Sequence, residues 1–124
     1  MPIIRAADAP VFELPGVTFT GLAAPSRGSA ELCAWRLTVS PGLESPDAHT
    51  LDHDEVFVVT RGRIRLTPDS EAAGPGDAVV IPAGQPVQLV NPDQEPAEVI
   101  VAIRAGFTGK AADGSTIATP PWAR

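Results

Sequence analysis

The sequence predicts a single all-β domain, and three observations lead to that prediction. The chain has 124 residues, which is enough for one hydrophobic core and too few for two domains. It contains 14 prolines, and because proline interrupts helices, few stretches could form a long one. Between the prolines lie short runs rich in Val, Ile, Thr and Leu, with turn residues at a spacing of about 8 to 12 residues, as in β-sandwiches and barrels.

Two strands are expected in the N-terminal third, at residues 17–22 and 31–39. In the second of them Trp35 and Leu37 fall on one face by the two-residue period of a strand. We expect this face to point into the core. The Pro41-Gly42 pair that follows is a turn signal.

The rest of the barrel is expected to consist of shorter strands. They are predicted at residues 55–61, 63–67, 78–81, 87–91 and 99–103. Gly62 separates the first two runs and indicates a tight hairpin between them. Ile64 and Leu66 should then face inward. Pro82 ends the strand at 78–81, because proline cannot donate a hydrogen bond to a ladder.

The segment from Gly106 to Arg124 loses this periodicity and contains Gly, Ser, Thr and a Pro-Pro pair. The sequence therefore predicts a barrel over residues 1–105 and an irregular C-terminal arm or lid over 106–124. Trp122 is too apolar to lie free in solvent, so we expect it to pack on the barrel or on a partner chain.

Charge and composition exclude several classes of protein. Nine Lys and Arg against fifteen Asp and Glu give a net charge of −6, which repels nucleic acid and anionic membranes. The chain begins with no charged-then-apolar signal segment and has no apolar run near the ~18 residues of a membrane span. A single cysteine, Cys33, cannot form an intramolecular disulfide, which fits a reducing compartment. We expect a cytoplasmic protein.

Residues 76–91 have the sequence GDAVVIPAGQPVQLVN, and they match one of two motifs of a known family. The stretch resembles the second motif of the cupin superfamily, small β-barrels of jelly-roll type. That motif is Gly, five residues, Pro-x-Gly, two residues, His, three residues, Asn. Every landmark is present except the histidine, where this chain has Val87. Asn91 is expected to hold a turn.

Residues 42–62 resemble the first cupin motif, which is Gly, about five residues, His-x-His, three or four residues, Glu, six residues, Gly. The matching residues here are Gly42, His49, Glu55 and Gly62, and Leu51 stands in place of the second histidine. The resemblance covers about Trp35 to Ile103. It implies a cupin jelly-roll barrel, also called a double-stranded β-helix, and the family's habit of pairing barrels implies a homodimer.

The resemblance also implies that the usual metal site is degenerate. Cupins that bind metal use the two first-motif histidines, the glutamate and the second-motif histidine. Of these only His49 and Glu55 remain, because Leu51 and Val87 cannot donate to a metal. One imidazole and one carboxylate are fewer than the three protein ligands of catalytic zinc or non-haem iron sites. No cofactor is therefore expected.

His53 provides an alternative to this conclusion. If the chain bends, His49, His53 and Glu55 could form a displaced set of two histidines and one carboxylate for a divalent transition metal. A bend is needed because residues two apart on a strand are ~6.5 to 7 Å apart. Otherwise His53 is a surface residue between Asp52 and Asp54.

The barrel interior is the expected binding site. The pocket residues predicted from the motifs are Trp35, His49, Leu51, His53, Glu55, Phe57, Val87 and Leu89. An apolar pocket of this kind suits an aromatic or polyketide-like ligand better than a sugar phosphate. Burial raises the pKa of a carboxyl group and lowers that of a histidine, so His49 and Glu55 could act as a base and an acid.

Three functions remain open at this point. The first is a cupin that binds a small molecule without turnover, as an accessory or sensor protein. The second is a metal-independent isomerase, cyclase or lyase that uses His49 and Glu55 as catalytic residues for proton transfer. The third is a metal-dependent oxygenase that uses His49, His53 and Glu55.

Overall fold

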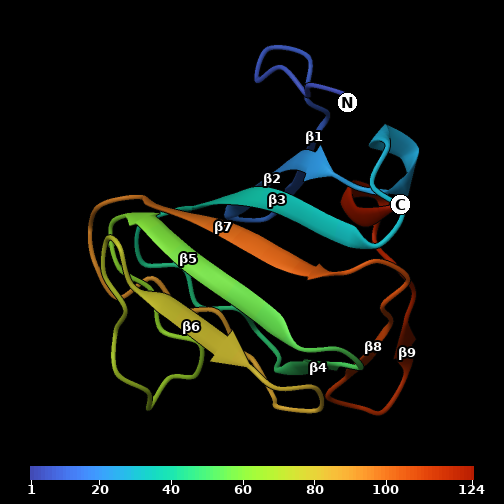
Figure 1. Ribbon diagram of the computed structural model, residues 1–124. Coiled ribbons are helices and arrows are strands. Elements are labelled where there is room, and N and C mark those ends of the chain that lie inside the picture. Colours follow the sequence, from blue (N-terminus) through green and yellow to red (C-terminus); the bar gives the residue numbers. More distant parts are fainter.

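A computed structural model describes all residues, 1–124, and contains nine strands, two short 3₁₀ turns and no α-helix (Figure 1). The prediction of an all-β fold is confirmed. The larger sheet has the order β1-β2-β3-β7-β5-β6. Its strands are β1 (Val11–Leu14), β2 (Val17–Ala23), β3 (Leu32–Val39), β5 (Glu55–Arg61), β6 (Ala78–Ile81) and β7 (Ala97–Arg104).

A smaller sheet forms the second layer, in the order β4-β8-β9. It contains β4 (His49–Leu51), β8 (Gly109–Ala111) and β9 (Thr116–Ile117). Single bridges extend it beyond β4: His49 pairs with Val87, and Arg65 pairs with Val90. The segments around residues 64–66 and 87–90 therefore complete this layer through isolated bridges and do not form continuous strands.

The core lies between the two layers, where the inward residues of β3, β5 and β7 alternate with outward ones. The buried residues of this core include Trp35, Leu37, Phe57, Val59, Ile64, Leu66, Val87, Leu89, Val99 and Val101. The inward face expected for the strand at 31–39 is confirmed.

The hairpin expected at Gly62 is not formed. β5 pairs with β6 and β7, and Arg65 crosses to the second layer to bond with Val90. Gly62 turns the chain at φ +69°, where a Cβ atom would lie only 2.6 Å from the carbonyl oxygen of Pro96. Ile64 and Leu66 are buried as expected. The alternating pattern predicted which side chains point inward, although it could not tell which strand this segment joins.

Asn91 is buried and holds the turns at one end of the barrel. Its Nδ2 donates to the carbonyl oxygens of Val39, Ser40 and Glu95 at 3.3, 3.2 and 2.8 Å. Its Oδ1 accepts a hydrogen bond from the backbone N–H of Asp93 at 3.0 Å. The turn role expected for this family landmark is confirmed.

The C-terminal segment is more regular than the sequence indicates. β8 pairs with β4 and β9 pairs with β8, so residues 109–117 belong to the second sheet. The chain then returns to the larger sheet through a 3₁₀ turn, η2 (Pro121–Ala123), beside β2 and β3 (Figure 1). Strands of two and three residues are too short to give a recognisable period. Trp122 packs on the barrel, stacking on Phe19 at 3.7 Å between ring centroids.

Helices that could cross a membrane are absent, since both helical segments are only three residues long.

Candidate functional site

Glu55 is the buried acid of the barrel. It is the first residue of β5 and shares the inward face with Phe57 and Val59, with only 4% of its surface exposed. Its neighbours on the adjacent strands are both apolar, Ile103 on β7 and Ile81 on β6. Burial raises the pKa of the Glu55 carboxyl to about 7, and no hydrogen bond or nearby charge offsets the effect. The group can therefore gain or lose a proton near neutral pH.

His49 lies on β4, in the second layer. Its backbone exchanges two hydrogen bonds with Val87, at 3.0 and 2.8 Å. The side chain is half-buried, and burial lowers the pKa of its imidazole. The imidazole is therefore neutral at pH 7. The direct pairing of His49 with Val87 also supports the motif alignment, because it brings a first-motif position beside a second-motif position.

Leu51 and Val87 stand at the two positions where the motifs have a histidine, and both lie in apolar surroundings. Val87 is buried, and Leu51 packs against the core. No group of three or more His, Cys, Asp or Glu side chains lies close enough together to hold a metal ion. The side chains of Leu51 and Val87 carry no atom that could bind a metal ion, so a degenerate metal site remains a prediction from the motifs.

His53 is held away from this region. Its Nδ1 lies 2.7 Å from Oδ1 of Asp52, and its side chain is 30% exposed. Asp52 in turn accepts hydrogen bonds from the backbone N–H and the hydroxyl of Thr108, at 2.9 and 3.1 Å. The structure therefore does not bring His49, His53 and Glu55 together as a displaced metal set. The chain bends before β5 at residues 52 and 53, and in this bend the His53 side chain contacts Asp52.

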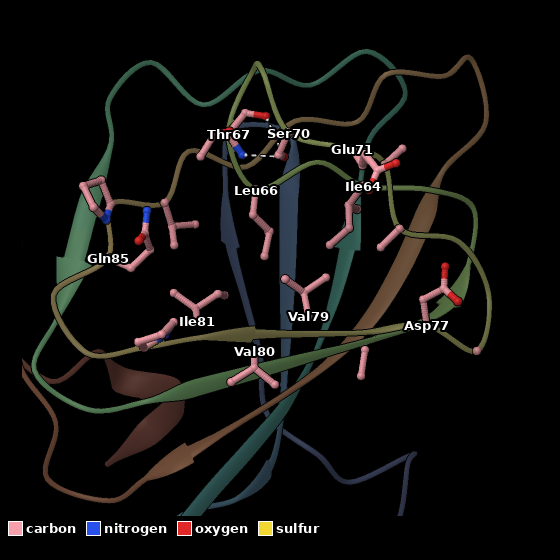
Figure 2. A pocket seen from close by; sticks show the side chains of 17 residues that line it. Ile64, Leu66, Thr67, Ser70, Glu71, Asp77, Val79, Val80, Ile81 and Gln85 are labelled. Atoms are coloured by element: carbon pink, nitrogen blue, oxygen red, sulfur yellow. Dashed lines mark hydrogen bonds between the residues drawn. The ribbon is translucent and has the colours of Figure 1, made fainter.

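A cavity of about 710 Å³ lies between β6 and the segment of residues 64–73 (Figure 2). In Figure 2, Val79 points from β6 toward Leu66 across this space, whereas Val80 points the opposite way. Its apolar lining includes Ile64, Leu66, Val79, Ile81 and Val87, and its polar lining includes Thr67, Ser70, Glu71, Asp77 and Gln85.

This cavity shares only Val87 with the pocket predicted from the motifs. Trp35, Phe57 and Leu89 belong to the packed core. Leu51 lines a second, smaller cavity of about 500 Å³ at β4 and β8. Glu55 does not line the larger cavity. Its partner in the β5–β6 pairing, Ile81, does line it. One signal in the sequence points to this site, because residues 68–77 are rich in Pro, Asp, Ser and Gly and form no strand.

The family model of the cupin domain matches residues 35–103 of this chain. This match covers more than half of the chain and the same span as the motif resemblance. A search of curated proteins finds no significant match.

Solved structures share the fold at low sequence identity. The polyketide cyclase RemF from Streptomyces resistomycificus superposes with a TM-score of 0.76 at 19% identity, covering 97% of this chain and 86% of RemF. KdgF from Halomonas sp. superposes with a TM-score of 0.67 at 19% identity, covering 82% of this chain and 93% of KdgF. An RmlC-like cupin from Ralstonia eutropha JMP134 superposes with a TM-score of 0.73 at 15% identity, covering 95% of this chain and 77% of that protein. Identities this low establish the fold alone.

Proposed function

The chain belongs to the cupin family, and from its cavity we propose that it binds an apolar or aromatic small molecule without a metal ion. The cavity between β6 and residues 64–73 carries this proposal. Its volume of about 710 Å³ is within the range of small-molecule sites. Its wall includes Val87, the position where the family has a metal-binding histidine, so an apolar surface replaces a metal ligand.

The charges around the cavity support an uncharged ligand. Glu71 and Asp77 line it, and no Lys, Arg or His does so. Acidic groups without a basic partner repel phosphates and carboxylates. The donor set supports the metal-free part of the proposal, because His49 and Glu55 have lost two of their partners to Leu51 and Val87.

Filling the cavity should abolish binding. We expect 1-naphthol, a neutral bicyclic aromatic, to bind the native protein and raise its thermal midpoint, since ligands that bind the folded state stabilise it. Val79→Trp puts an indole into the cavity and should weaken binding at least about tenfold. Val11→Trp makes the same change at an exposed site on β1 and should leave binding unchanged. The measurement is isothermal titration calorimetry, with and without EDTA.

Equal affinity in Val79→Trp and the native protein would place the ligand elsewhere. Loss of binding in EDTA would contradict a metal-free site. If no neutral bicyclic aromatic compound binds at about 100 μM, the proposed function is wrong.

Proton transfer is the second candidate function, and the raised pKa of Glu55 favours it. An acid with a pKa of about 7 and a neutral histidine in one barrel are the two groups that an isomerase or cyclase needs. In this reaction His49 removes a proton from carbon, and the protonated Glu55 supplies one to the carbonyl oxygen. The structural similarity to a polyketide cyclase is compatible with this chemistry.

Deuterium exchange at the α-carbon of 2-tetralone, followed by NMR, tests this candidate. The exchange rate should fall as pH rises through about 7, where Glu55 loses its proton, and should fall again at low pH as His49 becomes protonated. Glu55→Gln should slow exchange by about 100-fold or more. Exchange at the native rate in Glu55→Gln and in His49→Ala would exclude both residues from catalysis.

A further inference from the structure

The cavity of about 500 Å³ at the small sheet differs in kind from the cavity of the proposed function, with which it shares no residue. Its walls come from β4, β8, β9 and the turn that follows β6, which lies beside β4 (Figure 1). Leu51 and Ala83 are its apolar lining residues, and the other side chains in its wall are polar. The cavity therefore suits a small polar molecule.

The strand register gathers polar side chains on one face of the small sheet. Thr50 on β4 pairs with Lys110 on β8, which pairs with Thr116 on β9. Residues that lie directly opposite one another share a face, with Cβ atoms ~4.5 to 5.5 Å apart. The N–H of Asp52 donates to the carbonyl oxygen of Thr108 at 3.0 Å and continues the pairing by one step. All five side chains line the cavity.

The cavity holds one charge of each sign. Its charged lining residues are Asp52 and Lys110, and Lys110 is the only lysine of the chain. The ion pairs of the chain are His53–Asp52 and Arg63–Asp93, so the two charges in the cavity do not pair with each other. Their rows lie ~7 Å apart along the strands. The two charges are therefore placed to bind opposite ends of one small molecule.

The carboxylate of Asp52 is held in a fixed orientation. Its Oδ1 accepts a hydrogen bond from the backbone N–H of Thr108 at 2.9 Å and lies 2.7 Å from Nδ1 of His53. Its Oδ2 accepts from the hydroxyl of Thr108 at 3.1 Å. An ionised carboxylate has about four acceptor sites, so one site on Oδ2 remains for a ligand. A group that is already oriented loses little freedom when a ligand binds.

The wall formed by residues 83 and 84 is fixed as well. The N–H of Gly84 donates to the carbonyl oxygen of Leu51 at 2.8 Å, and the N–H of Ala83 donates to Oδ1 of Asp54 at 2.8 Å. These bonds join the turn after β6 to β4 and to the loop before β5. The cavity is therefore formed before any ligand enters.

We propose that this cavity binds a free α-amino acid with a small uncharged side chain. The ammonium group of the amino acid donates to Asp52, and its carboxylate accepts from the Lys110 ammonium and the Thr116 hydroxyl. The side chain lies against Leu51 and Ala83. A zwitterion matches both charges of the cavity, whereas a phosphate would be repelled by Asp52 and a simple amine by Lys110.

NMR titration of the ¹⁵N-labelled full chain with L-alanine at pH 7 and constant ionic strength tests the proposal. The backbone amide signals of Gly84, Thr108 and Gly109 should shift with a dissociation constant on the order of 1 mM. Propionate and ethylamine are L-alanine without its ammonium and without its carboxylate. Each should bind at least about tenfold more weakly, because each loses a charge-assisted hydrogen bond.

Substitutions at Lys110 test the polarity of the site. Lys110→Met keeps most of the length of the side chain and removes its charge, so it should weaken L-alanine binding at least about tenfold. Lys110→Glu leaves two acids in the cavity and should reverse the preference, so that ethylamine binds more tightly than L-alanine. Arg61→Met removes an exposed cation on β5, outside the cavity, and should leave the affinity for L-alanine unchanged. The NMR spectrum of each variant verifies that its fold is intact.

Four results would overturn the proposal. They are the absence of shifts with L-alanine up to about 50 mM, shifts confined to residues outside the cavity, equal affinity for propionate, and native affinity in Lys110→Met. Val79→Trp fills the other cavity and should bind L-alanine like the native protein. The two sites can therefore be tested independently, and failure of the proposed function would leave this site standing.

Discussion

Replacing Glu55 by glutamine should stabilise the protein by about 3 kcal/mol at pH 8 and by far less at pH 4. The magnitude follows from the pKa of the carboxyl, which burial raises from 4.5 to about 7, at about 1.4 kcal/mol per unit. For a chain of this length the gain corresponds to roughly 10 °C in the thermal midpoint. Glutamine has the same shape and no charge, so it removes the penalty of ionising a buried acid.

The direction with pH follows from proton binding. Between pH 4.5 and about 7 the folded state keeps the Glu55 proton while the unfolded state has lost it. The native protein therefore loses stability as pH rises through this window, and the loss is complete above it. His49 acts in the opposite direction, because burial lowers its pKa and its folded form resists protonation in acid. Comparing the variant with the native protein at each pH cancels the histidine contribution.

Urea unfolding at pH 4, 6 and 8 measures the effect. Glu13→Gln on β1 is the matched control, since Glu13 is exposed and lies outside the buried core. A gap between Glu55→Gln and the native protein that is the same at pH 4 and pH 8 would show that Glu55 ionises normally in the folded state.

The two cupin motifs were sufficient to predict the fold, because their landmarks mark backbone geometry. Gly62 and Gly84 have positive φ, and Asn91 satisfies three carbonyl groups. The alternation in residues 31–39 and 99–103 placed the inward side chains correctly. These features are local in sequence, so they can be read without the structure.

The site was harder to predict, since it depends on contacts between distant residues. His53 is fixed by Asp52, which is itself held by Thr108 in a segment that appeared irregular from the sequence. The larger cavity arises because residues 68–77 form no strand and leave β6 at the edge of its sheet. Of the residues predicted to line a pocket, Trp35, Phe57 and Leu89 lie in the buried core cluster. How far side chains fill a barrel is decided by packing, which strand periodicity does not report.

Trp122→Ala should destabilise the protein by about 3 kcal/mol, or roughly 10 °C, as for other large aromatic truncations. The half-buried indole stacks on Phe19 at 3.7 Å and lies 6.5 Å from Trp35, centroid to centroid. Around it, Arg27 donates to the carbonyl oxygen of Trp122 at 2.7 Å, and the Cys33 thiol donates to that of Ala123 at 3.3 Å. The indole therefore anchors the C-terminal segment to β2 and β3. Trp122→Phe keeps a stacked ring and should lose less than half as much, as measured by urea unfolding.

The position of Trp122 also bears on whether the C-terminal segment is an anchor for the fold or a lid over the cavity. It packs against β1 and β2, at the opposite edge of the large sheet from β6, which borders the cavity. A lid would control access, so its loss would change the affinity for 1-naphthol more than the stability. An anchor at the far edge contributes to stability and leaves affinity unchanged within about twofold. Calorimetry on Trp122→Ala below its melting range decides between these roles, and altered affinity in a variant with native stability would identify the segment as a lid.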